Sequence, residues 1–277
     1  MIDGLIRGWI AIVALWVLPF LLLRYTSPGK YRSGTVYWAA CLGIFAHHAF
    51  SVANYLFGPF FFTSLDPHML NNLASTIADF PDAIAWSVGS QFYVKWLAIF
   101  YHLLGADTFV WDGPQMYVGQ TLTVSVFLIT TVVLLWFLEW LDVRNSLTVT
   151  CAVLAWALFP AELIYGSVTA REAFMTLALM LAVASFWWLF ASNRLRFFWF
   201  GAFCLCVMGL FHQIMLIYAL VATMAVGLLW LFQSQLLTAR TKLLCLIAVF
   251  LAALLLFAGL LYLPVAQNEY YVDMLKG

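Results

Sequence analysis

Apolar residues in this chain occur in long continuous runs. Each run holds about 20 residues, which is the length that an α-helix needs to cross a hydrocarbon core about 30 Å thick. Segments such as Leu243 to Leu263 are apolar on every face, so the alternation typical of β-barrel strands is missing. The pattern predicts an all-α, polytopic membrane bundle of about eight transmembrane helices, over residues 5–24, 35–62, 115–141, 146–164, 171–191, 197–212, 213–232 and 243–263.

Composition supports a membrane protein and limits its partners. Hydrophobic residues make up 66% of the 277 residues and charged residues 9%, whereas a soluble domain carries about 25% charged residues. The net charge is zero, so no basic character indicates nucleic acid as a partner. All five cysteines lie in apolar runs without a Cys-x-x-Cys pair, so we expect neither disulfides nor a zinc site.

The basic residues predict the orientation in the membrane. With eight crossings, eight of the twelve Lys and Arg residues lie in loops on one side, and cytoplasmic loops are rich in such residues. These are Arg24, Lys30, Arg32, Arg144, Arg194, Arg196, Arg240 and Lys242. We therefore expect a multi-pass protein of the cell (inner) membrane, surrounded by lipid bilayer, with both termini external.

One connection is much longer than the others. Residues 62–114 form an external loop, and within it Ile84 to Leu104 are apolar enough to resemble a ninth span. That segment carries Lys95 and His102, and a basic residue at mid-bilayer costs about 2.5 to 3.5 kcal/mol. We interpret it as an interfacial or re-entrant helix within a single membrane domain, residues 1–277.

Polar residues on the external side form three clusters. In the first, Asp66 precedes Pro67, and a proline suits the first position of a helix, so Asp66 could be the helix cap. The alternative is that the Asp66 carboxylate acts as a general base or helps to hold a divalent metal ion. In the second, an external turn over residues 160–172, Thr169 and Glu172 fit a capping box. The third is the turn pair His212 and Gln213, which satisfies backbone groups or contributes to ligand binding.

Arg171 stands out within the second cluster. A cation beside a helix N-terminus opposes the helix dipole unless an anion is also bound there. Exposed amides together with a guanidinium suit a phosphate. The alternatives are a salt bridge to Glu162 or Asp66, or contact with lipid headgroups.

His47 and His48 lie near the middle of the second predicted helix. Ionisable residues at that depth are functional hypotheses by default. A paired haem site would need another histidine at similar depth, and none is present, so hydrogen bonds to neighbouring helices are the simpler interpretation. No Walker loop, G-x-G-x-x-G, H-E-x-x-H or G-x-S-x-G motif supports nucleotide or hydrolase chemistry.

Three stretches carry a family resemblance. The first is a loop that opens with an acidic residue, over residues 66–74. The second is an interfacial helix that ends in a Gly turn, over residues 89–105, and the third is an external turn with a Pro, a Ser and a charged helix start, over residues 159–172. Their order resembles the GT-C class of polyprenyl-phosphate-sugar-dependent glycosyltransferases, which includes protein O-mannosyltransferases and lipid A aminoarabinose transferases. The resemblance covers roughly residues 60 to 265.

The resemblance implies a function and roles for the external residues. The protein would move a sugar from a polyprenyl-phosphate donor to a glycan, lipid or protein acceptor at the outer face of the membrane. Asp66 would be the catalytic carboxylate, and Arg171, Glu172 and His212 would surround the donor phosphate or a divalent metal ion. Four further residues are candidates for substrate contacts or for positioning these groups: His68, Lys95, Glu162 and Gln213.

Three other functions stay open. An oligosaccharide polymerase would favour an Arg-rich external loop, whereas Lys95 is the only basic residue of residues 62–114. A transporter would need an inverted repeat and a polar path, and apart from His47 and His48 we expect dry helix interiors. A non-catalytic subunit, bound to partner membrane subunits, fits the many aromatic residues.

Overall fold

The chain forms an all-helical bundle in a computed structural model that describes residues 2–32, 34–57, 66–79, 90–103, 114–168 and 171–233. In these ranges there are ten α-helices and one 3-10 helix. They are α1 (Ile2–Thr26), η1 (Gly29–Tyr31), α2 (Gly34–Phe57), α3 (Asp66–Asp79), α4 (Ser90–Leu103), α5 (Pro114–Trp140), α6 (Ser146–Leu158), α7 (Pro160–Tyr165), α8 (Glu172–Ser192), α9 (Arg196–Phe211) and α10 (Gln213–Gln233).

Four of the described helices are long and apolar enough to cross a membrane, which makes this a multi-pass membrane protein of fewer spans than predicted. They are the apolar parts of α2, α5, α8 and α10, residues 34–54, 118–140, 172–192 and 215–233. Each predicted span up to residue 232 overlaps a helix. The helices α6 (Ser146–Leu158) and α9 (Arg196–Phe211) are shorter than a span, and the fully described apolar part of α1 is Val13–Thr26. The predicted span 243–263 lies outside the described residues.

A proline explains why the predicted helix 146–164 is two helices. Phe159 adopts an extended conformation (φ −60°, ψ 126°) and Pro160 begins α7. Proline has no N–H and disfavours helical geometry in the residue before it, so the helix must break here. The 13 residues of α6 are about 20 Å long, which is less than the thickness of a bilayer core.

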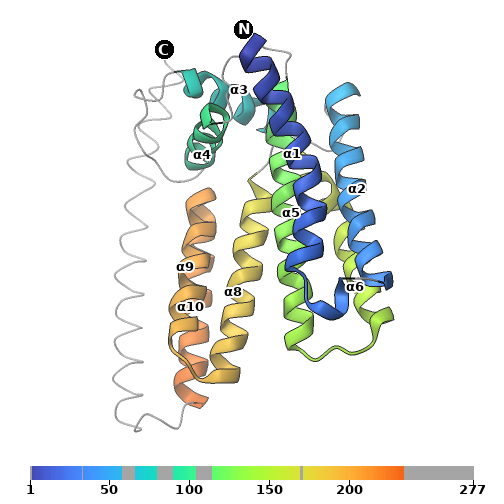
Figure 1. Ribbon diagram of the computed structural model, residues 1–277. Coiled ribbons are helices and arrows are strands. Elements are labelled where there is room, and N and C mark those ends of the chain that lie inside the picture. The colour runs from blue at the N-terminus through green and yellow to red at the C-terminus, as the bar shows by residue number, and fades with distance from the viewer. Residues whose placement is uncertain are drawn as a thin grey trace, which may run out of the picture.

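The bundle has two unlike ends (Figure 1). At one end, α3 and α4 lie over the bundle; each has 14 residues and is about 21 Å long, too short to span. We call this the α3–α4 end. At the opposite end the chain turns from α1 to α2, from α5 to α6 and from α8 to α9.

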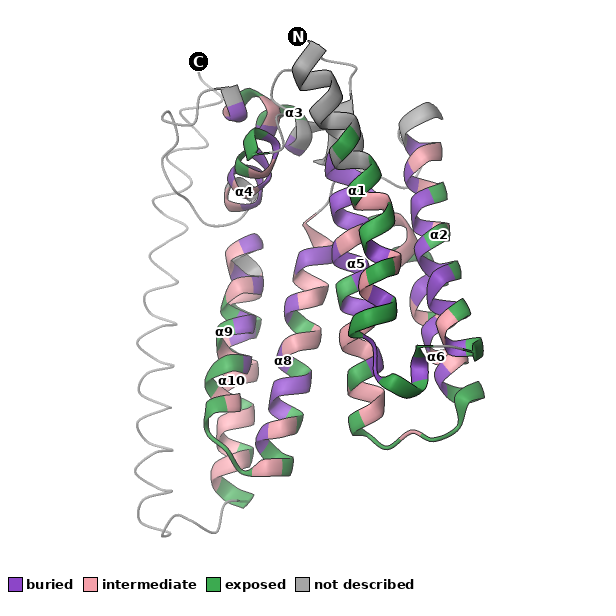
Figure 2. Cartoon of the chain, in the orientation of Figure 1, coloured by how far each residue is buried: buried purple, intermediate pink, exposed green. Residues whose placement is uncertain are grey.

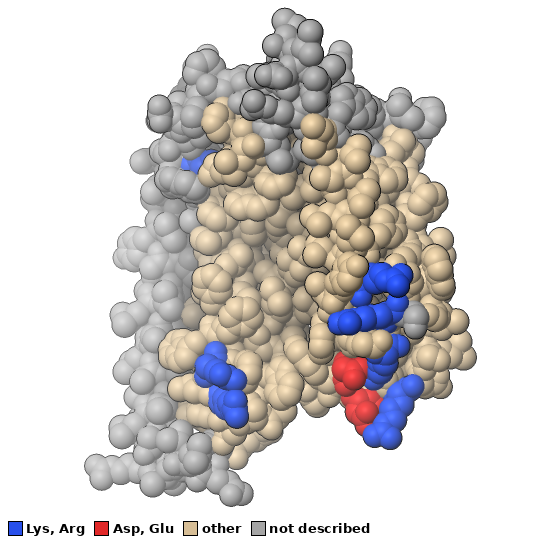
Figure 3. Space-filling view, viewed as in Figure 1, with Lys and Arg blue, Asp and Glu red and all other residues tan. Residues whose placement is uncertain are grey.

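Basic residues concentrate at that opposite end, which we call the basic end (Figure 3). Its turns carry Arg24, Lys30, Arg32, Arg144, Arg194 and Arg196. Lys30 pairs with Glu139 at 2.5 Å, and Arg144 pairs with Asp142 at 2.8 Å. The charge asymmetry on which the predicted orientation depends is therefore present in the folded bundle.

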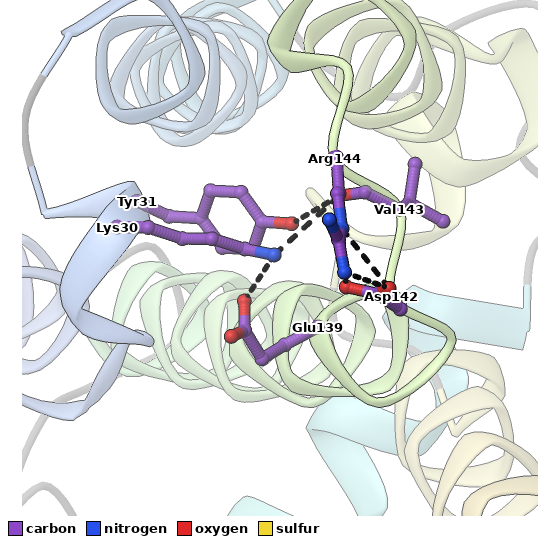
Figure 4. Close-up of polar contacts among 6 residues, drawn as sticks. All are labelled: Lys30, Tyr31, Glu139, Asp142, Val143 and Arg144. Carbon is purple, nitrogen blue, oxygen red and sulfur yellow. Dashed lines mark hydrogen bonds and ion pairs between the residues drawn. The ribbon is translucent and has the colours of Figure 1, made fainter.

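Polar contacts at the basic end join η1 to the turn after α5 (Figure 4). Lys30 and the Tyr31 hydroxyl both donate to the backbone carbonyl of Val143, at 3.4 and 3.3 Å. The Glu139 carboxylate raises the pKa of Lys30, and the Arg144 guanidinium lowers the pKa of Asp142. These pairs are solvent-exposed, so each stabilises the fold by only about 0–1 kcal/mol.

Three hydrophobic cores run along the bundle, and burial is concentrated between the helices (Figure 2). The core at the basic end joins α1, α2, α5 and α6. A second core joins α8, α9 and α10. The third lies beneath α3 and α4 and places the candidate site.

Candidate functional site

One large core beneath α3 and α4 contains a residue close in sequence to each of the three predicted polar clusters. This core contains Leu70, one helical turn after Asp66; Ala173, two residues after Arg171; and Phe211, the neighbour of His212. The fold therefore places the start of α3, the start of α8 and the end of α9 around one core at one end of the bundle.

Aromatic rings of α4 fix this arrangement. Tyr93 is fully buried, with its ring centroid 5.6 Å from Phe174 and 6.1 Å from Phe211. Trp96 lies edge-on to Phe174 at 4.9 Å. Such edge-to-face pairs stabilise a fold by about 0.5–1.5 kcal/mol beyond their burial, so α4 is held against the start of α8 and the end of α9.

Electrostatics also relate α4 to the start of α8. Burial raises the pKa of the Tyr93 hydroxyl, and the negative charge of Glu172 raises it further. The Glu172 carboxylate is thus close enough to act on a group beneath α4. Lys95, a candidate substrate-contacting residue, is also on α4 and is only 4% exposed.

Arg171 is the N-cap residue of α8, and its own side chain makes no capping hydrogen bond to the helix amides. Its side chain is 16% exposed, and its Nε lies 3.7 Å from the Glu172 carboxylate. The structure makes Arg171 the residue before α8, and Thr169 lies outside the described residues, so the capping box of Thr169 and Glu172 stays a prediction. The first amides of α8 and the guanidinium are the elements of an anion site.

The predicted external turn 160–172 is not a simple surface turn. After α7, Gly166, Ser167 and Val168 are buried within the bundle. Glu162, on α7, accepts a backbone hydrogen bond from Gly166 at 2.7 Å, and burial raises the pKa of the Glu162 carboxyl group. Non-helical backbone at membrane depth is tolerated only when it is enclosed by protein or lines a polar cavity.

Three of the predicted site side chains cannot be placed. Asp66 and His68 belong to α3 and Gln213 begins α10, but their side chains lie outside the described residues. His212 is the extended C-cap residue between α9 and α10, and its carbonyl accepts a hydrogen bond from Met215 at 2.8 Å. This is the predicted backbone role for the His212 turn.

His47 contacts both sides of the helix break. Its Nε2 lies 3.1 Å from the Ala157 carbonyl, and its Nδ1 lies 3.1 Å from the Ser167 hydroxyl. A carbonyl can only accept, so we assign the proton to Nε2, and Ser167 then donates to Nδ1. The prediction that a buried histidine bonds to neighbouring helices is confirmed for His47.

The prediction of dry helix interiors apart from the two histidines is wrong. Between α2 and α5, the Ser51 hydroxyl donates to Gln120 Oε1 at 3.1 Å, and both residues are fully buried. Asn54 is 2% exposed on the same helix. The sequence signal was present, because residues 47, 51 and 54 follow the spacing of one helix face.

Metal binding was predicted only as an alternative. In the part of the chain that the structure describes, no group of three or more His, Cys, Asp or Glu side chains could hold a metal ion. Asp66, Arg171 and Glu172 were the residues expected near such an ion, and the side chain of Asp66 lies outside the described residues.

Comparison with known proteins gives no relative. No family model, no curated protein and no solved structure matches this chain. The function must therefore be argued from the site itself.

Proposed function

We propose that this protein is a membrane glycosyltransferase of the GT-C type, which moves a sugar from a polyprenyl-phosphate donor to an acceptor at the α3–α4 end. The observation that supports this most strongly is the shared core of Leu70, Ala173 and Phe211. It gathers the starts of α3 and α8 and the end of α9, the elements that carry Asp66, Arg171 and His212.

The phosphate of the donor binds at the start of α8. The first backbone amides of a helix are unpaired donors and carry a partial positive charge. At α8 the Arg171 side chain does not cap these amides, and it adds a full charge beside them. Glu172 weakens this field, so the amides and Arg171 must act together, with His212 as a further donor.

The reaction is a single displacement at the anomeric carbon. Asp66 takes the proton of the acceptor hydroxyl while the hydroxyl oxygen bonds to the anomeric carbon. The bond from this carbon to the phosphate oxygen breaks, and polyprenyl phosphate leaves with its electrons. A single displacement inverts the anomeric configuration. Arg171 and the α8 amides stabilise the charge that develops on the leaving phosphate.

The orientation follows from the charges. The basic end faces the cytoplasm by the positive-inside rule, so the α3–α4 end, where α1 begins (Figure 1), is external in the cell (inner) membrane. There α3 and α4 lie at headgroup depth, where the phosphate of a lipid-linked sugar is found. The C-terminus, also predicted to be external, lies outside the described residues.

Donor binding tests the proposal. Purified protein in nanodiscs is titrated with a polyprenyl-phosphate sugar, as wild type, Arg171→Ala and Arg144→Ala. Hydrogen bonds to charged groups are worth about 1.5–3 kcal/mol, so Arg171→Ala should weaken binding about 10- to 100-fold. Arg144→Ala, at the exposed basic end, should bind as wild type does.

Two results would reject the proposal. One is a wild-type protein that shows no donor binding, and the other is equal loss of affinity in both arginine variants. Either would favour a non-catalytic membrane subunit, for which charge at the α3–α4 end has no ligand-specific role.

A further inference from the structure

A second polar site lies between α1, α2 and α5, apart from the site proposed above. His48 and Ser51 on α2 and Gln120 on α5 are fully buried there. Trp16 of α1 stacks on the His48 ring, with centroids 4.1 Å apart and planes at 19°. The stacked indole covers one ring face and leaves the two nitrogens at the ring edge to other partners.

The hydrogen bonds of this site are incomplete. Among the described residues, neither nitrogen of His48 has a hydrogen-bond partner, and neither has Gln120 Nε2. Gln120 uses only its carbonyl oxygen, which accepts from Ser51 at 3.1 Å. A neutral imidazole offers one N–H and one lone pair, and the amide offers two more N–H groups, so donors and an acceptor remain unmet in a buried place.

Helix spacing and one hydrogen bond relate these groups. Ser51 follows His48 by three residues, and side chains with this spacing are neighbours about 5–6 Å apart on a helix. Ser51 donates to Gln120 Oε1 at 3.1 Å, which places the Gln120 amide beside the α2 face that carries His48. Asn54 is one further turn along α2 and is also buried, which continues the polar face toward the α3–α4 end.

His47 shows that protein atoms can supply both hydrogen-bond partners of a buried imidazole at this depth. Both nitrogens of His47 are bonded to protein atoms, the Ala157 carbonyl and the Ser167 hydroxyl. Adjacent residues on one helix therefore differ. Among the described residues, protein atoms bond to both ring nitrogens of His47 and to neither ring nitrogen of His48.

We propose that His48 and Gln120 bind water within the bundle, in a small hydrated site between α1, α2 and α5. Water both donates and accepts, so it matches a set of groups that includes N–H donors and a ring lone pair. Buried waters commonly make about three hydrogen bonds to groups that would otherwise be unsatisfied. The site takes an uncharged ligand, because its groups are a hydroxyl, an amide and a neutral imidazole.

The test compares the two histidines in one sample. Protein labelled with 15N-histidine is placed in bilayers, and magnetisation is transferred from water protons to the imidazole nitrogens by solid-state NMR. The chain has five histidines, so the His48 signal is assigned with His48→Gln and the His47 signal with His47→Gln. His48 should receive water magnetisation several-fold faster than His47, although both side chains are fully buried.

A substitution sharpens the test. Gln120→Leu removes the amide donors while keeping a similar volume, so the transfer rate at His48 should fall toward that of His47. Equal, slow transfer at both histidines in the wild type would overturn the proposal. An unchanged rate at His48 in Gln120→Leu would overturn the role given to Gln120. Neither result depends on whether the protein transfers a sugar.

Discussion

The two ends of the bundle hold their charges in different ways. At the basic end, Arg144 has 84% of its side chain exposed and pairs with its near neighbour Asp142. At the α3–α4 end, Arg171 is 16% exposed, lies at the start of a long helix and is 3.7 Å from the Glu172 carboxylate. Exposed charges that pair locally suffice to set orientation in a membrane, whereas a packed charge costs desolvation and must be paired.

The turn between α7 and α8 shows the same contrast in its packing. Gly166 is buried, and a Cβ there would lie 2.7 Å from both His47 and the Glu162 carbonyl. Gly29, at the basic end, has nothing within 4 Å of such an atom. Alanine substitutions at Gly166 and Gly29 test this difference in packing.

The largest expected effect on stability is that of Gly166→Ala. The added methyl must displace the His47 ring or the backbone of α7, and overpacking of this kind costs about 1–3 kcal/mol. Thermal unfolding in detergent should show a clear fall in Tm for Gly166→Ala, and for Gly29→Ala a change within about 0.5 kcal/mol. Similar shifts for the two variants would mean that the buried turn is not packed against His47.

A smaller effect is expected for Ser167→Ala. The change leaves the Nδ1 acceptor of His47 without its donor, and hydrogen bonds between helices in membranes are worth about 0.6 to 1.7 kcal/mol. The matched control is Ser192→Ala, because the Ser192 hydroxyl donates to a carbonyl of its own helix, that of Trp188, and bridges no two helices among the described residues. Chemical unfolding should rank Ser167→Ala below Ser192→Ala in stability, and the reverse order would contradict the bridge across the helix break.

The smallest effect is expected at the basic end, for Lys30→Gln. This pair with Glu139 is about one-third exposed on each side, so its loss should cost less than about 1 kcal/mol. Because Glu139 raises the pKa of Lys30, the contribution is present at neutral pH and is lost as pH rises through that raised pKa. Unfolding at two salt concentrations checks this, since added salt should lower the free energy of unfolding of the wild type toward that of the variant. If Lys30→Gln lowers the free energy of unfolding by much more than about 1 kcal/mol, the contrast between the two ends is contradicted.

Much of the fold follows from local patterns in the sequence. The hydropathy pattern located α1, α2, α5, α8, α9 and α10 because a run of apolar residues needs no information about its neighbours. The segment around Lys95 was predicted to lie outside the spans, and its described part, α4, is too short to cross. One predicted span, 146–164, is shortened because Pro160 ends α6, which hydropathy alone did not register.

The buried polar site could be predicted only in part. The spacing of His48 and Ser51 places them on one face of a helix, but their partner Gln120 is 69 residues from Ser51. The partners of His47 are 110 and 120 residues away. Pairings of this kind depend on how α2, α5 and α6 pack, which local periodicity does not determine.

Sugar transfer by the purified protein is the most direct test of the proposed glycosyltransferase reaction. Wild-type protein in nanodiscs, Asp66→Asn and Asp142→Asn are compared for transfer from a polyprenyl-phosphate sugar to a mixture of glycan, lipid and peptide acceptors. Asp142 is a suitable control because it is exposed at the basic end, and its φ of 52° is tolerated by Asn. The account predicts transfer by the wild type and by Asp142→Asn, and loss of transfer with retained donor binding in Asp66→Asn. Transfer that persists in Asp66→Asn, or none in the wild type, would contradict it.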